Sequence, residues 1–244
     1  MDFLEDLPYS LSRAGPSKVD GVGNYYLQIM SRQQVETPLV TLYLLDSHGQ
    51  VPSPTGAQDY GYITQSQIDW FSSTAKSLKS TRLDHNAHDT QTHRSSLAFM
   101  HIPFPEYGDE SLIITAGKRR EPTEGPSFNS HFYDVLAHEG VVAVGCGHDH
   151  LNDFCGVLPS QPAATEGDQQ LAAPTAPHRP WLCYAGGIGF GAYGSYGGTR
   201  YQRRARLWEF DAQTQGVKTW KRVQYSADRV DEIVLAERGS NKYP

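Results

Sequence analysis

Several features typical of particular protein classes are scarce or missing in this chain of 244 residues. The 27 acidic residues outnumber the 21 lysines and arginines, which argues against a nucleic-acid binder, because such proteins usually carry a basic face. No apolar run approaches the length of a membrane span, and the acidic start, Met1–Asp6, lacks the apolar stretch of a signal peptide. We therefore expect no membrane segment and no nucleic-acid partner, and the sequence leaves the compartment open.

Cysteine is equally scarce. Cys146, Cys155 and Cys183 are too few for a disulfide framework, and Cys146 lies in an apolar run where it is expected to be an inert buried thiol. The composition, 38% hydrophobic and 20% charged, is ordinary for a globular protein. With no repeat and no second domain in view, we expect one domain over residues 1–244, interrupted by a disordered Ala/Pro-rich insertion near residues 159–180.

The pattern of apolar residues predicts a mixed α/β fold. A helix should begin at the N-cap Thr64 and run to about Leu78, before a polar loop over residues 79–94, and a second should end at His138 before Gly140. Residues 107–128 should form a long connection without regular structure. Short β-branched or aromatic runs predict strands at residues 25–29, 39–45, 97–102, 141–146, 181–185, 204–210 and 217–225, the first two and the last two as antiparallel pairs.

The most informative stretch is the apolar run over residues 141–146, which ends in Gly147-His148-Asp149-His150. Such a run reads as a buried strand, and its carboxyl end presents two imidazoles one residue apart. Ligand sites of α/β folds lie at strand ends, and neutral imidazole is the commonest metal ligand in proteins. His101 closes another predicted strand, so we expect His101, His148 and His150 to bind metal together, rather than to be solvated or hydrogen-bonded to the backbone.

These histidines stand in motifs that resemble a known family. The segments Ala98–Tyr107, which contains His101, and Gly147–Gly156, which reads Gly-His-Asp-His-Leu-Asn-Asp-Phe-Cys-Gly, are similar to the C-terminal half of calcineurin-like metallophosphoesterases. The resemblance is closest to the fungal and plant branch related to purple acid phosphatases, and it covers nearly the whole chain. It implies a sandwich of two mixed β-sheets flanked by helices, with metals at the strand ends.

The resemblance also implies a ligand set. The family holds two ions, with Fe, Mn or Zn as the metals, and a phosphate ester as the substrate. His101 matches the family's lone histidine, and His148 and His150 match its last motif. This assigns His101 and His148 to one ion and His150 to the other, with phosphate-ester hydrolysis by a metal-activated water as the implied activity.

The chain departs from the family pattern before His101. No Gly-Asp pair precedes it, and Gly23-Asn24 is followed by Tyr25, so the motif that carries the family's transition-state histidine is absent and no catalytic residue is assignable. Asp46-Ser47-His48 imitates the first family motif, but lies too close to His101. The chain resembles a member without its N-terminal half, and without a bridging carboxylate it should hold at best one weakly bound ion and be impaired as an enzyme.

Three polar residues close to the His-x-His motif are candidates for support. Asp149, Asn152 and Asp153 could accept the far ring N–H of a ligating histidine, or could simply cap the turn after the strand. His85, His88 and His93 lie in the polar segment and are expected to be solvated.

A glycine loop over residues 186–198 offers a rival site. Gly187-x-Gly189-x-x-Ala192 fits the dinucleotide fingerprint, but no helix is expected to follow, so the loop should instead carry backbone past the metal cleft with its tyrosines on a substrate rim. Four arginines next to this loop could attract phosphate or form one solvated face: Arg200, Arg203, Arg204 and Arg206.

Two alternatives to the phosphoesterase remain open. The chain could be a truncated, non-catalytic relative that acts as an interaction module, or a mononuclear zinc protein that uses His101, His148 and His150. Loss of half a sandwich would expose sheet edges, so we expect the isolated chain to aggregate or to need a partner or its missing half.

Overall fold

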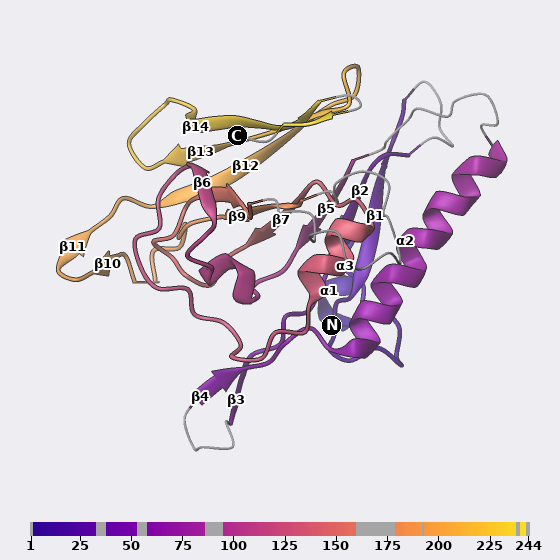
Figure 1. The fold of residues 1–244 in the computed structure, drawn as a ribbon, viewed down its shortest axis with the longest axis horizontal. Coiled ribbons are helices and arrows are strands. Elements are labelled where there is room, and N and C mark those ends of the chain that lie inside the picture. Colours follow the sequence, from indigo (N-terminus) through magenta and orange to yellow (C-terminus); the bar gives the residue numbers. More distant parts are fainter. Residues whose placement is uncertain are drawn as a thin grey trace, which may run out of the picture.

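The computed structural model describes residues 2–32, 38–52, 58–85, 95–159, 179–191, 193–237 and 240–242. A seven-stranded mixed sheet lies at its centre (Figure 1). The middle strands are parallel to one another, whereas the outer pairs are antiparallel. Across the sheet the strands are β1 (Tyr25–Met30), β2 (Pro38–Leu44), β5 (Ser96–Phe99), β7 (Ala143–Cys146), β9 (Trp181–Tyr184), β8 (Cys155–Val157) and β6 (Ile113–Ala116).

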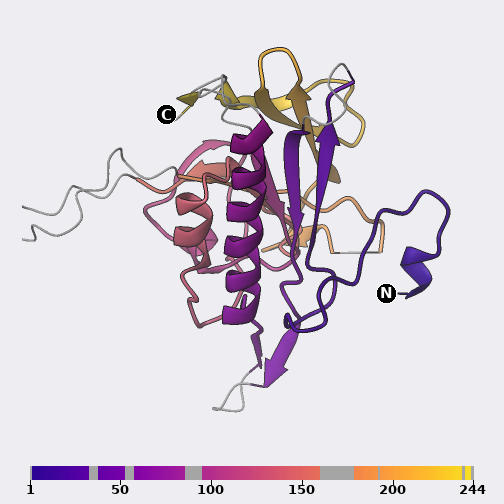
Figure 2. The same cartoon turned by 90° about the vertical axis from the view of Figure 1, so that its right-hand side faces the viewer.

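Two layers cover the central sheet, because its strands are apolar on both faces. Val144 and Leu182 belong to a core shared with the helices α2 (Gln65–His85) and α3 (Phe132–His138). The alternate residues Ala143 and Trp181 pack against a second, antiparallel sheet on the opposite face (Figure 2). The strands of that sheet, in order, are β12 (Arg204–Asp211), β13 (Gly216–Val223), β14 (Val230–Glu237) and β15 (Ser240–Asn241).

This arrangement confirms the expected mixed α/β class and both antiparallel pairs. The described strands of the second sheet pair only in antiparallel fashion, and the helices lie on the far side of the central sheet. Within the described residues, no helix is both long and apolar enough to cross a membrane. At one edge of the central sheet β1 exposes Tyr26, Ile29 and Met30, and the expected aggregation of the isolated chain stays a prediction.

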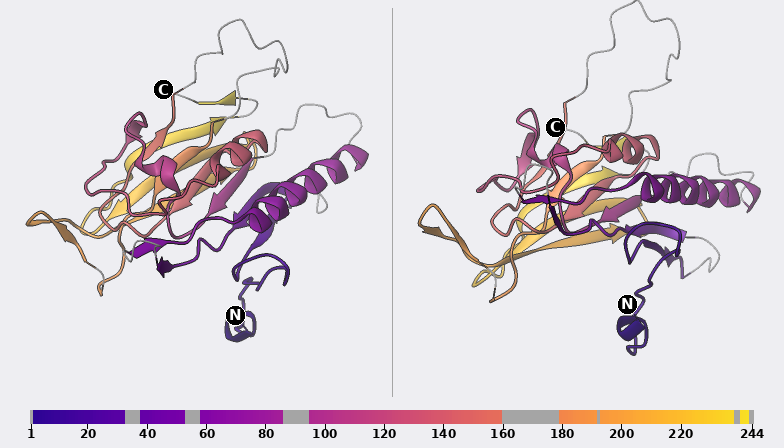
Figure 3. Two further views of the ribbon diagram at one scale, coloured as in Figure 1. Left: turned by 60° about the horizontal axis from the view of Figure 1, so that its bottom comes forward. Right: turned by 90° about the horizontal axis from the view of Figure 1, so that it is seen from below.

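Short elements project from this body (Figure 3). Two are hairpins, in which β3 (Gln50–Pro52) pairs with β4 (Gln58–Tyr60) and β10 (Ser195–Tyr196) pairs with β11 (Thr199–Arg200). The terminal helix α1 (Asp2–Glu5) also lies outside the body, whereas the 3₁₀ helix η1 (Pro105–Gly108) packs against the core through the buried Tyr107.

Helix α2 begins after the predicted N-cap but ends later than expected. Thr64 donates its backbone N–H to the Gln67 side chain, as in a capping box, and accepts the N–H of Ile68. The helix continues through the polar residues 79–85, where a loop was expected, because lysine, leucine and arginine sustain a helix without an apolar stripe. His85 therefore ends a helix, whereas His88 and His93 lie outside the described residues.

Other expectations were incomplete. The connection predicted over residues 107–128 contains β6, and the strands β8 and β14 were not predicted, because β6 and β8 are short and β14 alternates with charged residues. Cys155 and Cys183, on the neighbouring strands β8 and β9, form a disulfide, which the cysteine count had argued against, while Cys146 is free and buried as predicted. The insertion expected near residues 159–180 falls mostly on residues 160–178, outside the described part.

The carboxylate of Asp153 ties the two sheets together. It is fully buried and pairs with Arg120, with Arg204 of β12 at 2.6 Å and with Lys221 of β13 at 2.7 Å. It also accepts the backbone N–H of Lys118. Asp153 lies just before β8, Lys118 and Arg120 lie just after β6, and the other two cations belong to the second sheet. One side chain therefore fixes how the two sheets pack against each other.

Removing this charge should destabilise the fold. Asp153→Asn keeps the shape of the side chain but leaves the buried Arg204 without its carboxylate and Lys221 with only Asp231, so we expect the free energy of unfolding to fall by about 3 to 5 kcal/mol. The matched control is Glu209→Gln, since Glu209 pairs with Lys218 and Arg229 at the surface and should cost less than about 1 kcal/mol. Urea unfolding monitored by tryptophan fluorescence measures both variants, and equal losses would contradict the assignment.

The same carboxylate should make stability depend on pH. Burial alone would raise the pKa of Asp153, but Lys221, Arg204 and Arg120 outweigh it and hold the pKa at about 2. An aspartate in the unfolded chain has a pKa of about 3.9. Its stabilising contribution is therefore complete above about pH 4 and is lost as the pH falls through about 2. Wild-type protein should lose more unfolding free energy across this interval than Asp153→Asn, and parallel pH profiles would refute the expectation.

Candidate functional site

Two of the three candidate histidines meet because their strands are parallel neighbours. His101 follows β5 and His148 follows β7, and Phe99 is in register with Gly145. The pairing continues beyond the strand ends, since Gly147 donates its N–H to the His101 carbonyl at 3.0 Å. The imidazole rings of His101 and His148 lie edge to face, with centroids 5.4 Å apart.

Small side chains allow this close approach. A Cβ at Gly147 would lie 3.2 Å from Nδ1 of His101, so a larger residue there would press on the imidazole. On the other side Ser47, which follows β2, accepts the backbone N–H groups of His101 and Ile102 through its hydroxyl oxygen, at 3.2 and 2.8 Å. The segment that carries His101 is thus fixed by both neighbouring strand ends.

His148 is held by its backbone and by contacts of its ring. Its backbone is left-handed, with φ of 69°, and its ring lies edge to face with Tyr60 at 4.8 Å. Nε2 is buried and has no hydrogen-bond partner among the described residues. Burial, followed by the nearby His101, lowers the pKa of His148, which favours the neutral imidazole and keeps a lone pair available.

His150 has a different neighbour. Its ring stacks on Tyr193 of the glycine loop, with centroids 4.2 Å apart and an interplanar angle of 25°. Tyr193 accepts the backbone N–H of His150 and donates its hydroxyl to Glu121 at 3.0 Å. Nδ1 of His150 is buried and, within the described part of the chain, unpartnered.

Unpartnered buried imidazole nitrogens are costly unless something binds them, and a metal cation is the partner they suit best. The described ranges contain no group of three or more His, Cys, Asp or Glu side chains close enough to hold a metal ion. The histidines are therefore arranged as a pair, His101 with His148, and a separate His150. This arrangement speaks against the mononuclear site of three histidines.

The residues considered as supports for the histidines hold the loop instead. Asp149 is buried and accepts the hydroxyl of Tyr184 at 2.5 Å and the N–H of Glu124 at 3.3 Å. Burial raises the pKa of Asp149 to about 6. Asn152 accepts the N–H groups of Arg120 and Glu121 and donates to the Glu121 carbonyl. In the described residues none of these bonds reaches an imidazole, so any effect on the rings acts through the backbone.

Asp153, the third such residue, serves the sheet interface. Its partners include Arg204, and Arg206 donates to its carbonyl and to that of Tyr184. Arg204 and Arg206 are buried, so the expectation of one solvated arginine face was wrong for these two. Arg200 is exposed, while Arg203 lies over the Phe190 ring at 4.1 Å.

The segment that imitates the first family motif is structural. Asp46 accepts the backbone N–H groups of Val22 and His48, and Asn24 accepts that of Asp46. Gln67 of α2 joins them: its side chain bonds to the imidazole of His48 and donates to the side-chain oxygen of Asn24. These polar groups therefore anchor helix α2 against the end of β2.

The glycine loop passes beside His150 as expected. A Cβ at Gly187 would lie 2.9 Å from Cβ of His150, and Gly187 donates its N–H to the His150 carbonyl at 2.7 Å. The hairpin β10–β11 follows rather than a helix, which removes the dinucleotide fingerprint. A pocket of about 210 Å³ lies here, lined by His150, Tyr193, Tyr201 and their neighbours.

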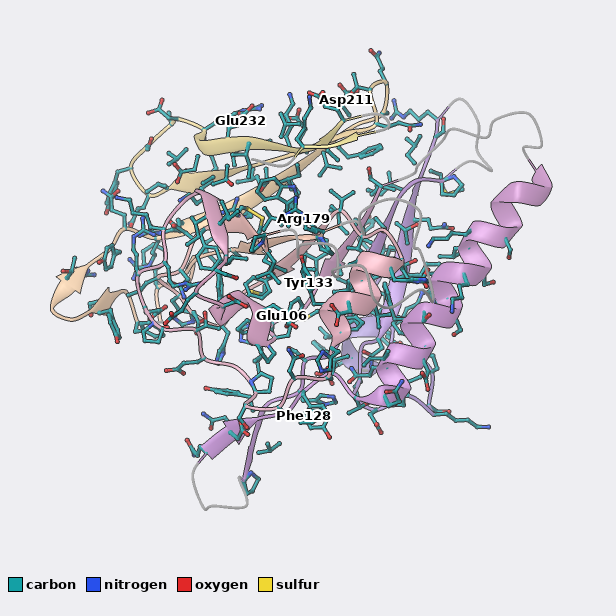
Figure 4. The ribbon with its side chains drawn as sticks, viewed as in Figure 1. Glu106, Phe128, Tyr133, Arg179, Asp211 and Glu232 are labelled. Atoms are coloured by element: carbon teal, nitrogen blue, oxygen red, sulfur yellow. A yellow bond between two sulfur atoms is a disulfide. The ribbon has the colours of Figure 1, made fainter. Side chains whose placement is uncertain are left out.

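A larger cavity of about 1030 Å³ lies elsewhere, between η1 and α3. Glu106, Tyr133 and Arg179 line it and are labelled in Figure 4. None of the three candidate histidines lines this cavity, so it is separate from the site at the strand ends.

Four residues around the histidines were not singled out from the sequence. Ser47, Tyr60 and Tyr193 contact a histidine or its backbone, and Glu121 accepts hydrogen bonds from Tyr193 and from the backbone of Leu151. Ser47 adjoins the Asp46 motif, and Tyr193 belongs to the tyrosines expected on a rim, so the sequence held a signal for both. Tyr60 and Glu121 lie in segments without a motif, and only the fold brings them near.

Comparison with known proteins finds relatives over nearly the whole chain. No family model matches the chain. Over 264 residues the chain is 35% identical to an Arabidopsis thaliana protein named "Probable inactive purple acid phosphatase 29", a match that covers 99% of this chain and 61% of that protein. Over 240 residues it is 33% identical to "Phosphatase DCR2" of Saccharomyces cerevisiae, covering 92% and 36% respectively.

A third relative, "Probable inactive purple acid phosphatase 14" of Arabidopsis thaliana, is 31% identical over 245 residues, which are 91% of this chain and 55% of the relative. The chain thus spans between about a third and three fifths of the length of these relatives. Nearly the whole chain takes part in each match, and the chain belongs to the family of purple acid phosphatase-like proteins.

Proposed function

We propose that this chain supplies the histidine half of a two-metal phosphoesterase centre. His101 and His148 would hold one ion and His150 the other, with Fe, Mn or Zn as the metals. The observation that carries the proposal is the pair of buried, unpartnered nitrogens, Nε2 of His148 and Nδ1 of His150, beside strand ends of a phosphatase-related fold.

The substrate in this proposal is a phosphate ester. Bound ions would supply Lewis acidity at the phosphoryl oxygens and lower the pKa of a bound water. The chain's own contribution is positional: Ser47 and Gly147 hold His101 against His148, and Tyr193 holds His150. The described residues offer no carboxylate grouped with the histidines to bridge two cations, so the chain alone should be a poor catalyst.

A non-catalytic role is the second candidate. It is favoured by the same absence of a three-ligand group in the described residues, and two of the relatives are themselves named as probable inactive phosphatases. In this reading the histidines bind a metal weakly or not at all, and the fold serves as an interaction module.

Metal binding tests the proposal directly. We expect His148→Asn to weaken zinc binding, measured by equilibrium dialysis of the purified chain, by at least about tenfold, the loss seen when even an outer partner of a metal ligand is changed. Asparagine is chosen because it tolerates the left-handed backbone at this position. His131→Asn is the matched control, since His131 is an exposed histidine outside the site whose backbone is also left-handed, with φ of 57°. Unchanged affinity in His148→Asn would refute the assignment.

Turnover separates the two candidates. We expect the chain alone, supplied with Zn, Mn or Fe, to hydrolyse para-nitrophenyl phosphate at less than about 1 s⁻¹, the lower end of ordinary enzyme rates. Faster turnover that His148→Asn abolishes would show that the chain holds a complete centre. Metal binding without turnover supports a half-site, and the absence of both favours the interaction module.

A further inference from the structure

The pocket beside His150 has two arginines, Arg200 and Arg203, among its lining residues. Its walls are formed by His150, Tyr193 and the segment Arg200–Arg203, with Gly187 and Gly189 at the loop. None of its lining residues is acidic, although the chain carries a net charge of −6. Its volume, about 210 Å³, is below the range usual for whole drug-sized ligands, so it suits one chemical group rather than a large molecule.

Its arginines are not neutralised. Within the described ranges neither Arg200 nor Arg203 pairs with a carboxylate, in contrast to Arg204, whose guanidinium is paired with Asp153. Arg203 donates through Nε and Nη2 to the carbonyls of Gly189 and Phe190, which holds its guanidinium in place. An arginine without a carboxylate partner in a small pocket is a ready site for an anion, because guanidinium matches phosphate and carboxylate geometry.

The pocket is also fixed against His150. Arg200 is in register with Ser195 in the β10–β11 hairpin, while Tyr193 stacks on the imidazole and bonds to Glu121. The backbone of Arg204 donates to Gly187, closing the base of the loop at 2.9 Å. An anion held by the arginines would therefore lie next to the residue proposed to bind the second metal.

We infer that this pocket binds a second anionic group of the substrate, so that the preferred substrate is a phosphate ester carrying a further phosphate or carboxylate close to the scissile ester. This substrate class rests on the proposed function, whereas the anion site itself does not. Arg200 and Arg203 would recognise this group, in a pocket that His150 also lines.

Anion binding by the metal-free full chain tests the inference without requiring turnover. Inorganic phosphate and malonate are titrated by isothermal calorimetry into wild-type protein, Arg200→Gln and Arg203→Gln. We expect each substitution to weaken binding about tenfold, as befits a lost charge-assisted hydrogen bond. Arg13→Gln is the matched control, since Arg13 is exposed and lies outside the pocket.

The outcomes are distinct. Selective phosphate binding identifies a second phosphate, and equal binding of malonate identifies a carboxylate or phosphate without preference. No binding, or equal affinities in Arg200→Gln, Arg203→Gln and Arg13→Gln, overturns the inference.

If the wild-type chain binds phosphate but no zinc, the proposed function is refuted, and with it the substrate class. Intact zinc binding with no phosphate binding would refute the pocket alone.

Discussion

The buried carboxylate of Asp153 is the constraint on which the rest of the fold depends. Burying one charge is unfavourable, and burying it among Arg120, Arg204 and Lys221 is tolerated only because each cation finds a defined oxygen. These partners belong to segments distant in sequence that the apolar core alone would not orient uniquely. The apolar contacts between the sheets drive their association, but these contacts are non-directional. The ion pairs form in only one relative position of the two sheets. The cluster also lies three residues after His150, so the same constraint that docks the second sheet positions the loop bearing the candidate ligands.

Polar residues around the strand ends divide into two groups. The side chains of Asp46 and Asn152 each accept two backbone N–H groups, and so fix the loops around them. The imidazoles of His148 and His150 do the opposite: they are held by ring contacts and by their backbones, while one nitrogen of each has no partner among the described residues. Within the described residues, these two nitrogens are the buried side-chain atoms of the segment 147–153 without a hydrogen-bond partner, and the proposed metal site rests on them. That contrast, more than the presence of histidine itself, distinguishes a site from a polar turn.

Periodicity and motif were sufficient for the central part of this molecule. The strands before His101 and His148 and the N-cap Thr64 could be predicted, because buried strands and capping boxes have local signatures. The short strands β6 and β8 could not, since three or four residues hold too little pattern. The role of Asp153 could not be predicted either. Asp153 looked like a support for a histidine because it is close in sequence, and only the second sheet, far along the chain, supplies the cations that occupy it.

The bond between Cys155 and Cys183 has a consequence for the stretch that separates them. It joins the adjacent strands β8 and β9. The two cysteines, 28 residues apart in the sequence, are therefore held together in the unfolded chain as well as in the folded one. Folding then does not have to close this loop again, and the entropy of closure, which grows with loop length, no longer opposes it. While the bond is intact, the length of the chain between Cys155 and Cys183 therefore adds no closure entropy to the cost of folding.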